Sequence, residues 1–401
     1  MNSSVRAFSI RTPPSSKRSS LAWGLCAVAL VFAYQTILVH RLGSNWTSLF
    51  CTGANIEIPP PLGFEHIYQI PNSNGYDGEF YHYVAHDPFL TRGFASAVDA
   101  PRVRYQRILL PLLAYTLAAG RDRFVDRAYF AVNLVFVFLG TYWLSRYSAN
   151  QARSPAWGLA FIALPAVLVS NDRMTVDAVL TALCVGFVLY SSEASGARLY
   201  LCLLLAALSR ETGYLLIASY CLWLLLERRP TAAVWFATSA LPALGWYLFV
   251  WTHAPYYHVK YISLPFTGLI IRLLNPTFYQ LSPGLRSVAI VCDYLALSGV
   301  ILALALSVRL AFEGARDPRA LAIYLFALLA VLLADQGVWR ELIAYGRAFT
   351  PLLLFLATVG FEDRRVASGI LFALPITIVT LPLLGARAVF LLHLAPSMVR
   401  P

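Results

Sequence analysis

Acidic, imidazole and aromatic side chains concentrate in residues 73–89, SNGYDGEFYHYVAHDPF, of a chain that is otherwise mostly hydrocarbon. Asp77 and Glu79 are two residues apart and follow a glycine-bearing segment that can approach a ligand closely. One carboxylate there could act as a general base on a hydroxyl group, and two could hold a divalent cation. The alternative is an Asx-turn at 74–78 that carries solvated acids, because a D-x-E pattern alone is a weak signal.

The aromatic residues around these acids strengthen the chemical interpretation. Aromatic faces stack on sugar rings, although they also pack at membrane interfaces. We therefore take Tyr76, Tyr81 and the adjacent His82 as candidates for contact with a substrate.

Charged residues also interrupt apolar runs farther along the chain. Arg210 and Glu211 in LSRETGYLL form either a local ion pair that caps a helical hairpin or a site that faces a ligand. Arg173 and Asp177 repeat this pattern between two other apolar runs. Arg347 in YGRAFTPLLL opens a predicted helix, where a guanidinium group and a helix N-terminus both favour an anion. These five residues are candidates for binding a substrate or its phosphate.

The composition places all of these candidates in a membrane protein. The chain has 401 residues, of which 59% are hydrophobic and only 13% are charged. Soluble domains carry about twice that charged fraction. The net charge of +11 does not predict nucleic-acid binding, because most basic residues lie in short connectors between apolar runs. The six cysteines are scattered without metal-type spacing, which predicts neither a disulfide framework nor a zinc site.

The hydropathy pattern predicts an all-α polytopic protein with about 11 transmembrane helices. The first 19 residues (1–19) are basic and rich in serine and proline, so we expect a disordered cytoplasmic tail. The predicted spans are 21–39, 126–145, 155–170, 174–191, 197–208, 212–226, 231–252, 287–308, 319–334, 345–360 and 367–385.

The apolar run 108–119, ILLPLLAYTLAA, decides the predicted orientation. If it spans the membrane, the basic connectors that follow it all lie outside, against the positive-inside rule. We therefore expect an interfacial helix within a long outer loop, 44–125, and a cytoplasmic N-terminus. On this topology the acids that interrupt the apolar runs share the outer face with the 73–89 segment, which suggests one water-filled cavity.

This layout resembles the GT-C superfamily of integral-membrane glycosyltransferases, nearest to the branch of protein O-mannosyltransferases and lipid A aminoarabinose transferases. The resemblance covers about residues 20–226 and rests on an acidic motif in the first outer loop (YDGEFY), an interfacial helix with proline (RILLPLLAYTLAAG), an outer turn with acids (SNDRMTVD) and a hairpin turn like the family's K/R-E-T-G stretch (LSRETG). Similar YDGEFY and YGRAF segments occur in uncharacterised bacterial membrane proteins. Residues 227–401 then form a variable C-terminal transmembrane module.

The resemblance implies transfer of a sugar from a polyprenyl-phosphate carrier to a glycan, lipid or protein acceptor at the outer face of the inner membrane, usually with inversion. It casts Asp77 as the general base and Glu79 as its assistant or as a metal ligand, with Arg210 and Arg347 near the carrier phosphate. Members differ in metal dependence, so a divalent cation on Asp77 and Glu79 stays open.

Three departures from the family pattern leave other functions open. RILLPLL replaces the His-Pro-Pro-Leu of the mannosyltransferases, the acids are not adjacent, and no soluble domain follows the last predicted span. The alternatives are a transporter or flippase, against which the absence of an internal repeat argues, and a GT-C-like protein that binds a lipid-linked sugar without turning it over.

Overall fold

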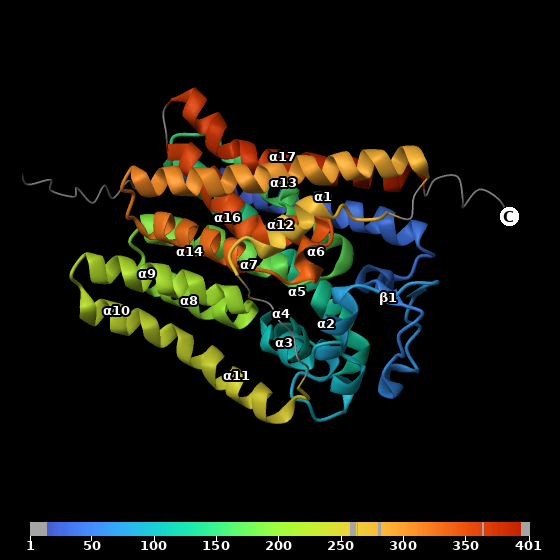
Figure 1. Cartoon of the computed structure of the whole chain (residues 1–401). Helices are drawn as coiled ribbons and strands as arrows, with labels where there is room; N and C mark the ends of the chain where they lie inside the picture. Colours follow the sequence, from blue (N-terminus) through green and yellow to red (C-terminus); the bar gives the residue numbers. More distant parts are fainter. Residues whose placement is uncertain (1–13, 257–261, 263, 280–281, 363–364, 394–401) are drawn as a thin grey trace, which may run out of the picture.

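The computed structural model describes residues 14–256, 262, 264–279, 282–362 and 365–393. Helices dominate this part of the chain (Figure 1). The helices of the N-terminal half are α1 (Pro14–Arg41), α2 (Asp77–His86), α3 (Pro101–Gln106), α4 (Leu109–Leu117), α5 (Asp122–Asn150), α6 (Pro165–Arg173), α7 (Asp177–Ser192), α8 (Gly196–Ser209) and α9 (Tyr214–Leu226).

The C-terminal half continues the helical bundle. Its helices are α10 (Pro230–Ala237), α11 (Leu241–His253), α12 (Thr267–Leu274), α13 (Pro283–Phe312), α14 (Pro318–Leu332), α15 (Gln336–Trp339), α16 (Leu342–Glu362) and α17 (Val366–His393). The short 3₁₀ helices are η1 (Trp46–Phe50), η2 (Pro60–Leu62), η3 (Phe94–Ala97), η4 (Pro155–Ala163), η5 (Glu211–Gly213) and η6 (Thr238–Ala240).

Each predicted span falls on one or more of these helices, but the number of spans is not confirmed. Six helical segments of the described chain are long and apolar enough to cross a membrane, or up to seven if the bent pair η4–α6 counts as one. The helices at 177–192, 196–209, 211–226 and 318–332 are apolar but have 10–17 residues. At about 1.5 Å per residue they are shorter than a hydrocarbon core of about 30 Å.

Two local predictions differ from the structure for identifiable reasons. The predicted span 155–170 is broken, because η4 and α6 meet at an angle of 58°. Leu164 at the break has an extended backbone, as a residue before proline prefers, and Pro165 begins α6. The predicted disordered tail 1–19 is also too long, since α1 begins at Pro14; residues 1–13 lie outside the described part.

The predicted outer loop 44–125 folds into a cap at one end of the helical bundle (Figure 1). A two-stranded parallel ladder, β1 (Thr52–Gly53) with β2 (Gln69–Ile70), ties its first half together. The run expected to lie at the interface forms α4, whose nine residues are too few to span a bilayer. Its proline lies in the first turn of the helix, where the missing N–H leaves no intrahelical bond unmade.

Helix α2 is the buried centre of this cap. Every residue from Gly78 to His86 is buried. Tyr81 and Ala85 pack into the main core of the bundle, whereas Phe80 and Tyr83 belong to a second core formed by the cap and α11. Because neighbours enclose it on all sides, this ten-residue helix is fixed by tertiary packing rather than by its own propensity.

Candidate functional site

Asp77 begins α2, although the sequence suggested a loop there. Both of its carboxylate oxygens bind arginines: Oδ1 lies 2.9 Å from Nη2 of Arg104, and Oδ2 lies 2.6 Å from Nη2 of Arg347. Burial alone would raise the pKa of Asp77, but the two guanidinium groups outweigh it and hold the pKa well below its usual range. Asp77 is therefore ionised in this arrangement, with its negative charge at a helix N-terminus.

The ion pairs continue from Arg347 into the next two helices. Its Nε lies 3.5 Å from Oδ2 of Asp177, which begins α7, and the other oxygen of Asp177 pairs with Arg210 at the end of α8. Arg210 Nε is in turn 3.5 Å from Oε1 of Glu211. The hairpin turn therefore contains the local ion pair that its sequence allowed, and Arg210 also pairs with Asp177 of α7.

Arg107 closes the network into a ring. Its Nε and Nη2 donate to the two oxygens of Glu211 at 2.8 and 2.7 Å, and its Nη1 donates to the hydroxyl of Tyr81 at 2.9 Å. The same hydroxyl accepts from Arg104 at 3.4 Å, which returns the chain of contacts to Asp77. A bidentate guanidinium–carboxylate pair such as Arg107–Glu211 is strong and geometrically specific.

The ring thus contains four arginines and three carboxylates, drawn from the cap, two inter-helix turns and α16. A further carboxylate, Asp99, binds Arg104 at 2.8 Å from the more exposed edge. Burying so many charges is costly unless each is paired. The members are Asp77, Tyr81, Arg104, Arg107, Asp177, Arg210, Glu211 and Arg347.

Tyr76 and Arg173 lie beside this ring. The guanidinium carbon of Arg173 is 4.2 Å from the centroid of the Tyr76 ring, and that of Arg347 is 5.4 Å away. Gly78 allows this packing, because a Cβ there would lie 2.0 Å from the carbonyl oxygen of Arg173. The YDG sequence thus brings α2 against the end of α6.

Glu79 is directed away from Asp77 into the cap. Its Oε2 accepts a hydrogen bond of 2.9 Å from the backbone N–H of Gly53. Its carboxylate also lies against Gly75, whose φ of +70° and close approach leave no room for a side chain. Burial raises the pKa of Glu79 to about 7, despite the bond from Gly53. Since Asp77 is occupied by arginines and Glu79 faces Gly53, the pair does not form a shared cation site.

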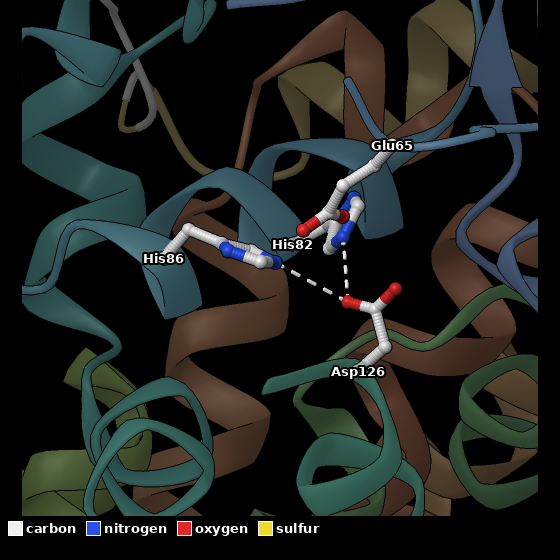
Figure 2. A group of neighbouring side chains, drawn as sticks. All are labelled: Glu65, His82, His86 and Asp126. Carbon is white, nitrogen blue, oxygen red and sulfur yellow. Dashed lines mark hydrogen bonds and ion pairs between the residues drawn. The ribbon is translucent and has the colours of Figure 1, made fainter. Parts of the chain in front are cut away.

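His82 does not belong to the ring either. It belongs to a second cluster, toward the other end of α2. Its Nε2 lies 2.8 Å from Oδ1 of Asp126, and His86 Nε2 lies 3.3 Å from the same oxygen. Glu65 completes a set whose four donor atoms all lie within 4.8 Å of one another (Figure 2). Hydrogen bonds to Asp122 and Asp126 outweigh burial and raise the pKa of His86 to about 9.

Of the ten residues singled out from the sequence, six lie in the ring, two lie beside it and two lie elsewhere. Tyr76 and Arg173 are the neighbours, and Glu79 and His82 are the two that lie elsewhere. The sequence analysis missed Arg104 and Arg107. Their signal was a pair of arginines three residues apart, directly before the interfacial helix.

Comparison of the chain with protein-family models, with curated proteins and with solved structures yields no match.

Proposed function

We propose that this protein is a membrane glycosyltransferase that moves a sugar from a polyprenyl-phosphate carrier to an acceptor hydroxyl, with Asp77 as the general base. One observation carries the proposal: Arg347 lies between Asp77 and Asp177, and its buried Nη1 has no hydrogen-bond partner among the described residues. A buried guanidinium with a free donor suits an anionic oxygen, because such an oxygen satisfies the charge and the hydrogen bond together.

The ring supplies the cations that a departing phosphate requires. Arg104, Arg107, Arg210 and Arg347 are held by carboxylates in the free protein, and a carrier phosphate can take over some of these contacts. Because Arg104 and Arg347 are what lower the pKa of Asp77, shifting either guanidinium to the phosphate raises the basicity of Asp77. Binding of the carrier phosphate would thus raise the pKa of Asp77 and make it a better general base.

In the proposed reaction, Asp77 accepts the proton of the acceptor hydroxyl. The acceptor oxygen forms a bond to the anomeric carbon, and the bond from that carbon to the carrier phosphate oxygen breaks. The leaving phosphate keeps the electron pair and is stabilised by the arginines, and the sugar passes through an oxocarbenium-like state with inversion. Tyr76 and Tyr81 line the approach as aromatic and hydroxyl contacts.

The proposed setting is the outer face of the inner membrane. The ring lies where the cap meets the ends of α6, α8 and α16, and the basic connectors Arg228–Arg229 and 309–319 lie at the opposite ends of α9 and α13. Under the positive-inside rule those connectors are cytoplasmic, so the ring faces outward, toward a carrier in the outer leaflet.

The test is release of labelled polyprenyl phosphate from a panel of radiolabelled polyprenyl-phosphate sugars by the purified full chain. We expect Asp77→Asn to lower the rate by about 10²–10⁴-fold, the usual contribution of a general base. Asp99→Asn is the matched control, because it also removes a carboxylate from Arg104 but at the exposed edge.

Binding of the carrier without turnover would replace this proposal by a non-catalytic lipid-sugar binding protein. If the protein neither binds nor turns over any carrier in the panel, transport becomes the function to test. Equal rates for wild type and Asp77→Asn would remove Asp77 from the reaction.

A further inference from the structure

The second cluster on α2 has the composition of a transition-metal site. His82 and His86 are four residues apart and project from one face of the helix, and Asp122 and Asp126 repeat that spacing on the facing turn of α5. Glu65 reaches the same point from the segment between η2 and β2 (Figure 2). Three separate parts of the chain thus place imidazole and carboxylate groups around one point.

The donors are of a kind that a divalent transition metal prefers. Two imidazole nitrogens and two carboxylate oxygens make a four-ligand set that suits Zn²⁺, whereas Mg²⁺ and Ca²⁺ prefer oxygen ligands alone. Tetrahedral zinc with bonds of about 2.0–2.1 Å places its donors about 3.3 Å apart. The contacts from Asp126 to His82 and His86, 2.8 and 3.3 Å, already have this scale.

The surroundings of His86 also fit metal ligation. Its Nδ1 lies 2.8 Å from Asp122 Oδ1, and Nη1 of Arg92 holds the same carboxylate oxygen at 2.7 Å. A carboxylate behind a histidine commonly orients the ring that binds zinc. His82 presents its Nε2 to the same point, 2.8 Å from Asp126 Oδ1, and its Nδ1 is buried without a hydrogen-bond partner among the described residues.

The cluster is accessible from outside the fold. It opens onto a cavity of about 1040 Å³ whose lining includes Glu65, Asp122 and Asp126, the arginines Arg123 and Arg127, and apolar residues of α1 and α5. The histidine side chains are fully buried behind the carboxylates, whereas the Asp126 side chain is 19% exposed. An ion can therefore enter through the carboxylates and reach the imidazoles.

We propose that Glu65, His82, His86 and Asp126 bind one Zn²⁺-class ion, which joins the segment between η2 and β2 to α2 and α5. Four protein ligands fill a tetrahedral shell, as in structural zinc sites. The ion lies at the opposite end of α2 from Asp77. It therefore fixes the position of the helix that carries Asp77 and Tyr81 of the ring. The inference does not depend on the transfer reaction.

The experiment measures zinc bound to the purified full chain after chelation, desalting and titration with Zn²⁺, by elemental analysis and by X-ray absorption at the zinc edge. We expect one zinc per chain, with imidazole and oxygen ligands at about 2.0–2.2 Å. His86→Ala and Glu65→Gln remove or neutralise ligands and should weaken binding at least tenfold. His66→Ala removes a neighbouring exposed histidine that lines the same cavity and should bind zinc as wild type does.

Asp122→Asn distinguishes a metal site from a simple cluster of ion pairs, because it leaves all four proposed ligands in place. Loss of the carboxylate that orients His86 should weaken zinc about 10–100-fold. Glu65→Gln also keeps the shape of its side chain, so its elution as a monodisperse protein distinguishes a lost ligand from a lost fold. Wild type that retains no zinc, or bound zinc whose affinity is the same in Glu65→Gln, His86→Ala and His66→Ala, overturns the proposal.

Discussion

The two ends of α2 have opposite electrostatic designs within a single ten-residue helix. At its start, Asp77 is an acid among arginines from α3 and α16. Toward its end, His82 and His86 face the acids Asp122 and Asp126. The first arrangement concentrates cationic donors and suits an anion, and the second concentrates lone pairs and suits a cation.

Helical geometry separates these two environments. Asp77 and Tyr81 are four residues apart and share one face, as do His82 and His86. At about 100° per residue the two faces differ by about 140°. A flexible loop with the same sequence would not keep the two faces at a fixed angle. The helix therefore explains how one segment rich in acids and histidines contributes to two different sites.

Gly78→Ala should have the largest effect, because it disturbs both the ion-pair ring and the zinc cluster at the two ends of α2. The added Cβ would lie 2.0 Å from the carbonyl oxygen of Arg173 and 2.8 Å from that of Phe50, and neither backbone atom can rotate away. We expect α2 to be displaced, with a cost of about 3 kcal/mol or more, beyond ordinary overpacking. Loss of both carrier turnover and zinc binding, with a lower thermal midpoint in detergent, would agree with this.

Gly196→Ala is the matched control for that substitution. A Cβ at Gly196 meets nothing within 4 Å, and the residue lies at the start of α8. Its midpoint should stay at or slightly above that of wild type, because alanine favours helix. If Gly78→Ala were equally stable, the tight contact between α2 and α6 would not hold in the protein.

The second prediction separates the two ends of α2. Arg347→Ala leaves Asp77 and Asp177 without one of their buried partners, which should destabilise the fold by about 3–5 kcal/mol. Arg347→Lys keeps the charge but loses the fork-shaped donor set, so it should cost less stability while still weakening polyprenyl-phosphate binding.

Zinc stoichiometry should be unchanged in Arg347→Lys, because this arginine contacts none of the zinc-cluster residues. Arg309→Ala is the control, since the Arg309–Glu313 pair has side chains that are 50% exposed and should contribute less than about 1 kcal/mol. A fall in zinc binding equal to the fall in carrier binding would mean that the two ends are one coupled site.

Local sequence pattern predicted much of the fold but less of the site. Apolar runs identified α1, α4 to α11, α13, α14, α16 and α17, because hydropathy is a local property, whereas α2, α3, α12 and α15 were not predicted. The break at Pro165 and the short helices depend on packing between segments. The positive-inside argument grouped the acids that interrupt apolar runs with the 73–89 segment, and the structure brings two of them, Asp177 and Glu211, into the ring with Asp77.

The sequence did not predict which charged residues pair with one another. Arg104 and Arg107 come just before the run 108–119 in the sequence, yet one binds Asp77 and the other binds Glu211, 104 positions along the chain. Glu79 looked equivalent to Asp77, but it occupies a different face of α2 and meets Gly53. Glu65 and Asp126 carry no motif of their own, and only the fold places them beside the histidines.

The smallest expected effect concerns Glu79, whose pH dependence sharpens its contrast with Asp77. Burial raises the pKa of Glu79 from its ordinary value of 4.5 to about 7. Between these values the folded protein holds a proton that the unfolded chain releases, so stability falls as the pH rises through this window. The full loss is at most about 3 kcal/mol by linkage. Asp77 behaves oppositely, because its lowered pKa stabilises the fold above the ordinary pKa and that contribution is lost in acid.

Glu79→Gln removes the titration while keeping an oxygen that can accept from Gly53. We expect the thermal midpoint of wild type to fall more steeply than that of Glu79→Gln between the two pKa values of Glu79. The comparison uses slopes rather than absolute midpoints, because Oε1 of Glu79 is buried without a hydrogen-bond partner among the described residues and an amide group there would carry its own cost. Equal slopes would mean that Glu79 titrates normally and that water reaches its carboxylate, and α2 would then be less enclosed at its start than at its histidines.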